Sequence, residues 1–277
     1  MPIPGAKGDY AAPGFRIALR INSLGLRGPE ADLGPGSRRW LVLGDSFTFA
    51  QQVREERTFA ALLGRSTGMQ FLNAGVDSYS TVQATLRYRR LVQKTRPEGV
   101  LLVFFLGNDI TDNERFQRFA RQNPRGHEAS ESHQQGARSS LLCRWILRHS
   151  YLYGHWQVWR ERRQLSQGSH LQAGQFRDEL LTFTTSGAER MARILEPTRA
   201  ALRELRQETS LRGQRLLVAL APPAFQVEPR RVAPTFKILG IPPSRVDLDA
   251  PLQITRALLQ ELKIPSCDLV APLREAQ

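Results

Sequence analysis

Short apolar runs, each followed by turn-forming residues, constrain the fold of this chain more than any other feature. The clearest run covers residues 100–106, where seven apolar residues follow one another. Runs of this length are typical of strands that a parallel sheet buries on both faces. The runs lie at residues 39–43, 70–73, 100–106, 216–220 and 267–270. They predict a sheet of about five strands.

Helical patterns separate these runs. They cover residues 55–63, 81–94, 186–209 and 251–262, and Pro197 is expected to kink or break the third helix. Strands that alternate with helices form crossover units and a parallel sheet covered on both faces. We therefore expect an α/β fold: one three-layer α/β/α domain over residues 1–277, flavodoxin-like in its winding. Residues 1–14 are expected to form an irregular arm, and residues 15–22 a weak strand.

An insertion interrupts this pattern at about residues 114–185. Its first part, residues 117–140, is polar and predicts a loop. Residues 141–163 predict a helix that carries three of the four Trp residues. Three roles remain open for this aromatic helix: packing onto the core, a lid that binds an acyl or glycan group, or contact with a membrane surface.

The chain is strongly basic, but its charge does not indicate a nucleic-acid partner. Lys and Arg total 39 against 26 Asp and Glu, which gives a net charge of +13. Because these basic residues are scattered along the chain, they are more typical of a solvated surface than of a nucleic-acid interface. The two Cys residues lack a metal-binding spacing. We expect neither a metal nor an organic cofactor.

No stretch of the sequence has the roughly 18 apolar residues of a membrane span, and its start lacks the apolar core of a signal peptide. As written, the chain is expected to be cytoplasmic. If the natural chain begins further upstream, we expect the protein to be in the cell envelope.

Three polar motifs follow successive predicted strands and indicate chemistry. Ser46 ends a Gly-Asp-Ser sequence, Gly75 ends Asn-Ala-Gly, and Asn108 lies within Gly-Asn-Asp. Taken singly, each is more typical of a helix cap or a turn. Together they place one hydroxyl and several hydrogen-bond donors at the carboxyl ends of strands, where open parallel sheets bind ligands. Acyl transfer from an ester needs this combination.

These motifs, in this order, resemble those of the SGNH/GDSL hydrolase family, and residues 21–27 resemble the segment that precedes them in many bacterial members. The resemblance implies that Ser46 is the nucleophile. It implies an oxyanion hole made by the backbone N–H groups of Ser46 and Gly75 and by the side-chain amide of Asn108. Asp45 and Asp109 would organise the local backbone.

The sequence departs from the family in its last motif, an Asp-x-x-His in which His is the general base. No such pair is present, and the five His residues all lie in the predicted insertion, at positions 127, 133, 149, 155 and 170. Three explanations stay open. The natural chain continues beyond Gln277, a His of the insertion replaces the missing base, or catalysis has been lost.

The expected function is hydrolysis of an O-acyl or O-acetyl ester through an acyl-serine intermediate. The substrate would be an acylated small molecule, lipid or glycan. The alternatives are a polysaccharide O-acetyltransferase and an inactive domain that binds a glycan or a protein partner.

A second serine motif is not expected to be catalytic. Residues 64–68 match G-x-S-x-G, but a nucleophile elbow needs a strand before its Ser and a helix after it. Here a helix precedes Ser66 and a strand follows. Gly68 is therefore predicted to end a helix.

Overall fold

The structure, a computed structural model, describes residues 2–12, 15–122, 176–237 and 239–276. Most of the predicted insertion, including the five His residues and the predicted aromatic helix, lies outside the described residues.

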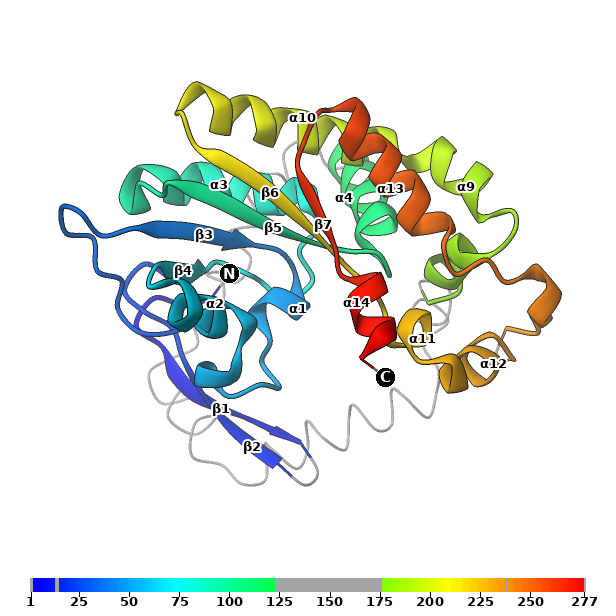
Figure 1. The fold of residues 1–277 in the computed structure, drawn as a ribbon, viewed down its shortest axis with the longest axis horizontal. Coiled ribbons are helices and arrows are strands. Elements are labelled where there is room, and N and C mark those ends of the chain that lie inside the picture. Colours follow the sequence, from blue (N-terminus) through cyan, green and yellow to red (C-terminus); the bar gives the residue numbers. More distant parts are fainter. Residues whose placement is uncertain (1, 13–14, 123–175, 238, 277) are drawn as a thin grey trace.

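A five-stranded sheet in the order β4-β3-β5-β6-β7 forms the centre of the molecule (Figure 1). Every neighbouring pair of these strands is parallel. The strands are β3 (Arg39–Leu43), β4 (Gln70–Asn73), β5 (Gly99–Phe105), β6 (Arg215–Ala221) and β7 (Ser266–Asp268). The prediction of a parallel sheet of about five strands is confirmed.

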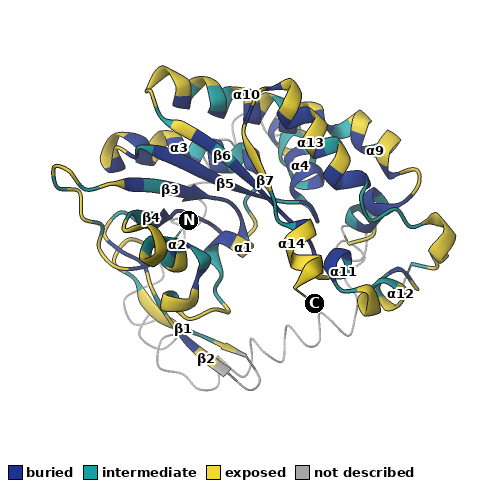
Figure 2. Cartoon of the chain, viewed as in Figure 1, coloured by how far each residue is buried: buried dark blue, intermediate teal, exposed yellow. Residues whose placement is uncertain are grey.

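Apolar side chains on one face of the sheet form the larger core. Leu43, Leu102 and Val218 pack there against helix residues such as Tyr88 and Leu205. The helices on this face are α3 (Thr81–Thr95), α4 (Asp109–Gln122), α9 (Gly187–Ile194), α10 (Glu196–Leu211) and α13 (Ala250–Glu261) (Figure 1). Figure 2 shows buried residues concentrated in the strands and in the helix surfaces that face them.

Alternate residues of the same strands point to the opposite face, as strand geometry requires. Val42, Val103 and Ala219 form a smaller apolar cluster there with Ala60. Ala60 belongs to α2 (Phe59–Thr67), which lies on this side of the sheet with the short helix α1 (Ser46–Phe49). The three layers expected from the sequence are therefore present.

A third apolar cluster packs beyond the sheet. The ring of Phe225 lies edge-on to Phe183 and to Phe236, with ring centroids 4.9 and 5.5 Å apart. These rings come from the short helices η2 (Leu181–Phe183), α11 (Ala224–Val227) and α12 (Pro229–Lys237). This cluster could not be predicted from the sequence, because its residues are separated by up to about fifty positions and follow no single period.

Several local boundaries differ from prediction. The break at Pro197 is confirmed, since Pro197 lies in the first turn of α10, where its missing N–H costs no hydrogen bond. Thr58 divides residues 55–63 into η1 (Glu55–Arg57) and α2, because its hydroxyl caps α2 by accepting from the Ala61 N–H. β7 ends at Asp268, whose carboxylate accepts a hydrogen bond from Val270 N–H as α14 (Val270–Glu275) begins.

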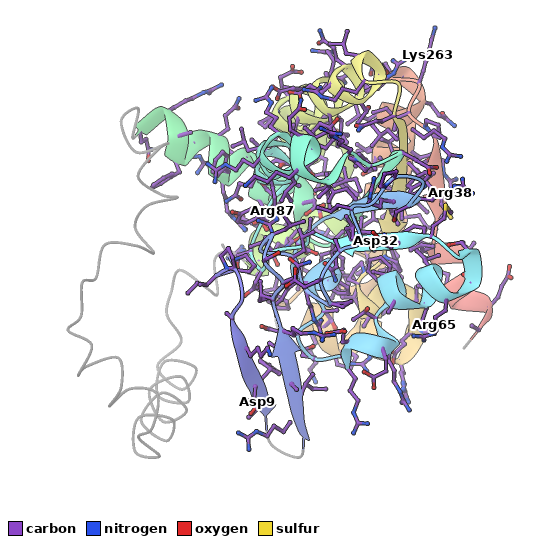
Figure 3. All side chains as sticks on the ribbon, turned by 90° about the vertical axis from the view of Figure 1, so that its left-hand side faces the viewer. Asp9, Asp32, Arg38, Arg65, Arg87 and Lys263 are labelled. Carbon is purple, nitrogen blue, oxygen red and sulfur yellow. The ribbon has the colours of Figure 1, made fainter. Side chains whose placement is uncertain are left out.

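The prediction of an irregular N-terminal arm is wrong. Strands β1 (Lys7–Ala12) and β2 (Phe15–Arg20) pair antiparallel, with Tyr10 opposite Ile17, and the hairpin extends from the body of the molecule (Figure 3). Backbone pairing with β2 organises a segment whose composition alone favours no regular structure.

The prediction that Gly68 ends a helix is confirmed. Gly68 follows α2 with a φ of 67°, and its N–H donates to the carbonyl of Gly64. Ser66 is exposed on that helix. Within the described residues, no helix is long and apolar enough to cross a membrane.

The packing of α10 leads to a stability prediction. Leu202 is fully buried against the sheet, whereas Leu211, on the same helix, is 77% exposed. Leu202→Ala should lower the free energy of unfolding by about 2–5 kcal/mol, because it leaves a cavity in the larger core. Leu211→Ala, the matched control, should change it by less than about 0.5 kcal/mol. Urea denaturation monitored by circular dichroism would measure both, and equal effects would contradict the described packing.

Candidate active site

Ser46 lies at the carboxyl end of β3 because the chain turns sharply into α1. Gly44 makes this turn with a φ of 151°, and a Cβ atom there would lie 2.2 Å from the Thr48 hydroxyl. The Asp45 carboxylate then caps α1 by accepting a hydrogen bond of 2.8 Å from the Phe47 N–H. Ser46 is therefore the first residue of α1, and it is partly exposed.

Asn108 lies at the carboxyl end of β5, the strand beside β3. The Asp109 carboxylate holds this turn by accepting a 2.9 Å hydrogen bond from the Phe105 N–H. The Asn108 carbonyl accepts from the Asp112 N–H in the first turn of α4. The Oδ1 atom of Asn108 is buried and has no hydrogen-bond partner among the described residues.

Ser46 and Asn108 line the same cavity, which has a volume of about 450 Å³. Its lining is mainly polar and comes from four parts of the chain. The other lining residues are Asp45, Asp77, Ser78, Gln83, Asp112, Arg115, Phe116, Phe119 and Glu179. The structure thus brings together two of the three residues that the sequence analysis singled out.

Gly75 follows β4, as expected, but it is not part of the cavity lining. It is buried and does not line this cavity, and its N–H donates a hydrogen bond of 3.0 Å to the Asn73 side-chain oxygen. A Cβ atom on Gly75 would lie 2.5 Å from the backbone nitrogen of Phe49. Gly75 therefore lets α1 approach the end of β4, and its N–H is not directed to the cavity in this structure.

Ser78, which the sequence analysis did not single out, lines the cavity instead. The loop after β4 is fixed by a hydrogen bond from the Val76 N–H to the Gly44 carbonyl and by another from the Tyr79 N–H to the Val76 carbonyl. Ser78 has a φ of 62°, a left-handed conformation that is uncommon for any residue except Gly. A non-Gly residue held in this conformation at a cavity is a feature typical of functional sites. The sequence carries no separate signal for it.

Two buried arginines fix the backbone around the site. The guanidinium of Arg27 donates hydrogen bonds to the carbonyl of Phe49, the last residue of α1, and to the carbonyl of Val53 beyond it. Arg87 donates through Nε to the Ala74 carbonyl and through Nη2 to the Gly25 carbonyl, both at 2.7 Å. Arg87 lies inside the body of the molecule in Figure 3. These contacts connect the segment at residues 21–27 to the ends of α1 and β4.

Burial changes the acidity of two carboxyl groups next to the site. It raises the pKa of Asp45 to about 6, from an ordinary value of 3.8. It also raises the pKa of Asp109 well above the ordinary range, and the nearby charge of Asp45 adds to this increase. Removal of a carboxylate from water disfavours its charged form, and two such groups close together disfavour it further.

Arg115 connects α4 to the chain beyond the insertion. Its guanidinium contacts the carboxylates of Asp112 at 2.6 Å and Glu179 at 3.3 Å. Burial raises the pKa of both carboxyl groups, and Arg115 opposes this increase. The carboxyl groups of Asp112 and Glu179 are therefore already paired with Arg115 on one side of the cavity.

None of the described residues is a His, the residue type expected as the general base. All five His residues lie in residues 123–175, so the prediction that one of them replaces the missing base stays untested. The described residues also contain no cluster of three or more His, Cys, Asp and Glu side chains suited to a metal ion.

Comparison with known proteins gives distant likenesses. No family model and no curated protein matches the sequence. Its structural neighbours are GDSL and SGNH esterases and lipases. A G-D-S-L family protein from Desulfitobacterium hafniense is 13% identical, with 84% of this chain and 77% of that chain covered and a TM-score of 0.39. An acetylxylan esterase from Geobacillus stearothermophilus is 14% identical, with 89% and 82% covered and a TM-score of 0.41.

The position of Gly75 leads to a test of its packing role. Gly75→Ala should lower the free energy of unfolding by about 1–3 kcal/mol, because the added methyl group meets the backbone of α1. Gly8→Ala is the matched control, since no atom lies within 4 Å of a Cβ there. Thermal unfolding would compare the two variants, and a Gly75→Ala protein as stable as the control would contradict the close approach of α1.

The raised pKa of Asp45 leads to a pH prediction. In the unfolded chain this carboxyl group ionises near 3.8, but in the folded protein it ionises near 6. Between these values the folded state binds more protons, so Asp45 lowers stability as the pH rises. From pH 4 to pH 7 the loss should be on the order of 2 kcal/mol.

The measurement is urea denaturation of the protein and of Asp45→Asn across this pH range. The Asn side chain keeps an oxygen that can accept from the Phe47 N–H but cannot ionise, so this variant should lose less stability as the pH rises. Glu189→Gln, an exposed change on α9, should behave like the unsubstituted protein. Parallel curves for all three would contradict the burial of an ionisable Asp45.

Proposed function

We propose that this chain is an SGNH-type ester hydrolase in which Ser46 is the nucleophile. The observation that carries the proposal is that Ser46 and Asn108, which follow two neighbouring parallel strands, line one polar cavity. A hydroxyl group and an amide group placed at such a sheet edge are suited to attack a carbonyl carbon and to bind the resulting oxyanion.

In the proposed reaction, Ser46 Oγ attacks the acyl carbon of the ester while a base removes its proton. The negative charge that develops on the carbonyl oxygen is stabilised by the Asn108 side-chain amide and the Ser46 backbone N–H. The alcohol leaves with a proton, and the acyl group remains on Ser46. Water then attacks this acyl-enzyme, which releases the acid and restores the hydroxyl.

We propose Ser78 in place of Gly75 as the second backbone donor of the oxyanion hole. Ser78 lines the cavity with Ser46 and Asn108, whereas Gly75 donates its N–H to Asn73. No described residue accepts a hydrogen bond from the Ser78 N–H. The left-handed conformation of Ser78 supports this assignment, because strained backbone persists where the surroundings hold it for a function.

The base of this reaction comes from outside the described residues. The candidates are a His of residues 123–175 and an Asp-x-x-His motif in a continuation of the chain. A serine hydroxyl without a base is a weak nucleophile, and loss of one member of a catalytic triad leaves only slow residual turnover. The rate of ester hydrolysis therefore shows whether a general base is present.

The first test is hydrolysis of 4-nitrophenyl acetate by the protein, by Ser46→Ala and by Ser66→Ala. Ser66 is a suitable control because it is exposed on α2 and lies outside the cavity. Ser46→Ala should lower turnover at least about a hundredfold, since the acyl-enzyme can no longer form. Ser66→Ala should leave it unchanged. Mass spectrometry should then find the acetyl group on the peptide that contains Ser46.

Other outcomes separate the alternatives. Turnover that persists in Ser46→Ala would contradict the proposed nucleophile. Transfer of the acetyl group to an added glycan, instead of release of acetate, would identify an acyltransferase. Glycan binding without any turnover would favour an inactive binding domain.

A further inference from the structure

The charge of the candidate site is opposite to the charge of the whole protein. The chain has a net charge of +13. The cavity at Ser46 is nevertheless lined by four carboxyl groups and, among the described residues, by one basic side chain. The carboxyl groups belong to Asp45, Asp77, Asp112 and Glu179, and the basic side chain to Arg115. The net charge of the protein would attract an anionic ligand at long range, whereas the carboxyl groups of the cavity would repel it inside the site.

Arg115 does not offset all of this negative charge. Its guanidinium already contacts both Asp112 and Glu179. Asp77 is exposed at the cavity, with no ion pair to a described residue. The described lining therefore contains four carboxyl groups and one guanidinium, and Asp77 is a carboxyl group that this guanidinium does not pair.

Two buried polar atoms next to the cavity have no hydrogen-bond partner among the described residues. Asp45 is only 3% exposed, and its Oδ2 atom has no hydrogen-bond partner among the described residues. Asn108 Oδ1 is likewise buried and unpartnered within the described part of the chain. Both atoms are acceptors, and buried acceptors are normally satisfied. Both atoms are closed to solvent in this structure, so the preference for a class of ligand follows from the charged groups of the lining.

We propose that this site accepts acyl esters whose alcohol part is uncharged or cationic, and that it rejects esters that carry a carboxylate or a phosphate. The inference rests on the proposed function of the site, and it names the substrate class. It narrows the range of acylated small molecules, lipids and glycans to neutral or cationic ones. Anionic phospholipids and phosphate-bearing acyl carriers fall outside that class.

The size of the effect can be estimated from the interaction of two unit charges. Two unit charges about 4 Å apart in water interact by about 1 kcal/mol, and more strongly where protein excludes water. One carboxylate at the cavity should therefore change the preference between neutral and anionic ligands by about two- to tenfold. Salt should weaken this preference, because mobile ions screen exposed charges.

The test uses three aryl acetates of similar size: 4-acetoxybenzyl alcohol, 4-acetoxybenzoate and 4-acetoxyphenyltrimethylammonium. Each kcat/KM is divided by the rate constant for hydrolysis by hydroxide, which removes the intrinsic reactivity of the ester. The neutral and cationic esters should exceed the anionic one by about three- to thirtyfold, and less in 0.5 M NaCl. Equal values, or a preference for 4-acetoxybenzoate, would overturn the inference.

Asp77→Asn tests the cause of the preference. Asp77 is exposed and makes no ion pair with a described residue, so this variant should fold normally. It should reduce the discrimination against 4-acetoxybenzoate about two- to fivefold. Glu56→Gln removes the same charge at an exposed position outside this cavity and should leave the discrimination unchanged. Equal effects of the two variants would assign the preference to net charge and overturn the role of the cavity.

Binding separates this inference from the proposed function. The same three esters are titrated into Ser46→Ala, with ligand NMR signals as the readout, where no acyl-enzyme can form. If the protein shows no turnover but Ser46→Ala binds the neutral and cationic esters more tightly, the charge preference stands and the hydrolase proposal fails. If Ser46→Ala binds none of them, or binds 4-acetoxybenzoate equally well, the inference fails whatever the turnover.

Discussion

The close approach of α1 to the ends of β3 and β4 is the constraint on which the rest of the site depends. Gly44 and Gly75 make this approach feasible, since a Cβ atom at either position would meet the atoms of α1. Hydrogen bonds then fix it: Asn73 Nδ2 donates to the Thr48 carbonyl, and Arg27 donates to the carbonyl of Phe49. Ser46 occupies its position at the cavity because its helix is held at both ends.

The same constraint explains why buried charge surrounds a small polar site. This packing leaves backbone carbonyls inside the protein without a backbone partner. Arg27 and Arg87 are buried because a long side chain with several N–H donors is needed to reach these carbonyls. Burial lowers the pKa of both arginines. The carboxyl group of Asp45 is buried for a related reason, because it caps a helix that lies against the sheet. Each of these buried groups makes hydrogen bonds to the backbone, as buried polar groups normally do.

Much of the fold could be predicted from the sequence, because the features that determine it are local and periodic. Residues 100–106 indicated β5 through their unbroken apolar run, and the strand positions placed Ser46 and Asn108 at one sheet edge. The hairpin and the position of Ser78 could not be predicted, because pairing between β1 and β2 and the path of the loop after β4 depend on tertiary contacts. Gly75 was recognised as important, but its packing role needed three-dimensional coordinates.

The most direct measurement of the central claim is labelling of the protein by a fluorophosphonate, followed by mass spectrometry of its peptides. This reagent reacts with a serine hydroxyl only where a base and an oxyanion site activate it. The account predicts a single modification on Ser46, at a rate that Asn108→Ala lowers at least tenfold, by loss of an oxyanion donor. Modification of another serine, or none on Ser46 under conditions that label an active serine esterase, would contradict the claim that Ser46 and Asn108 form a working acyl-transfer site.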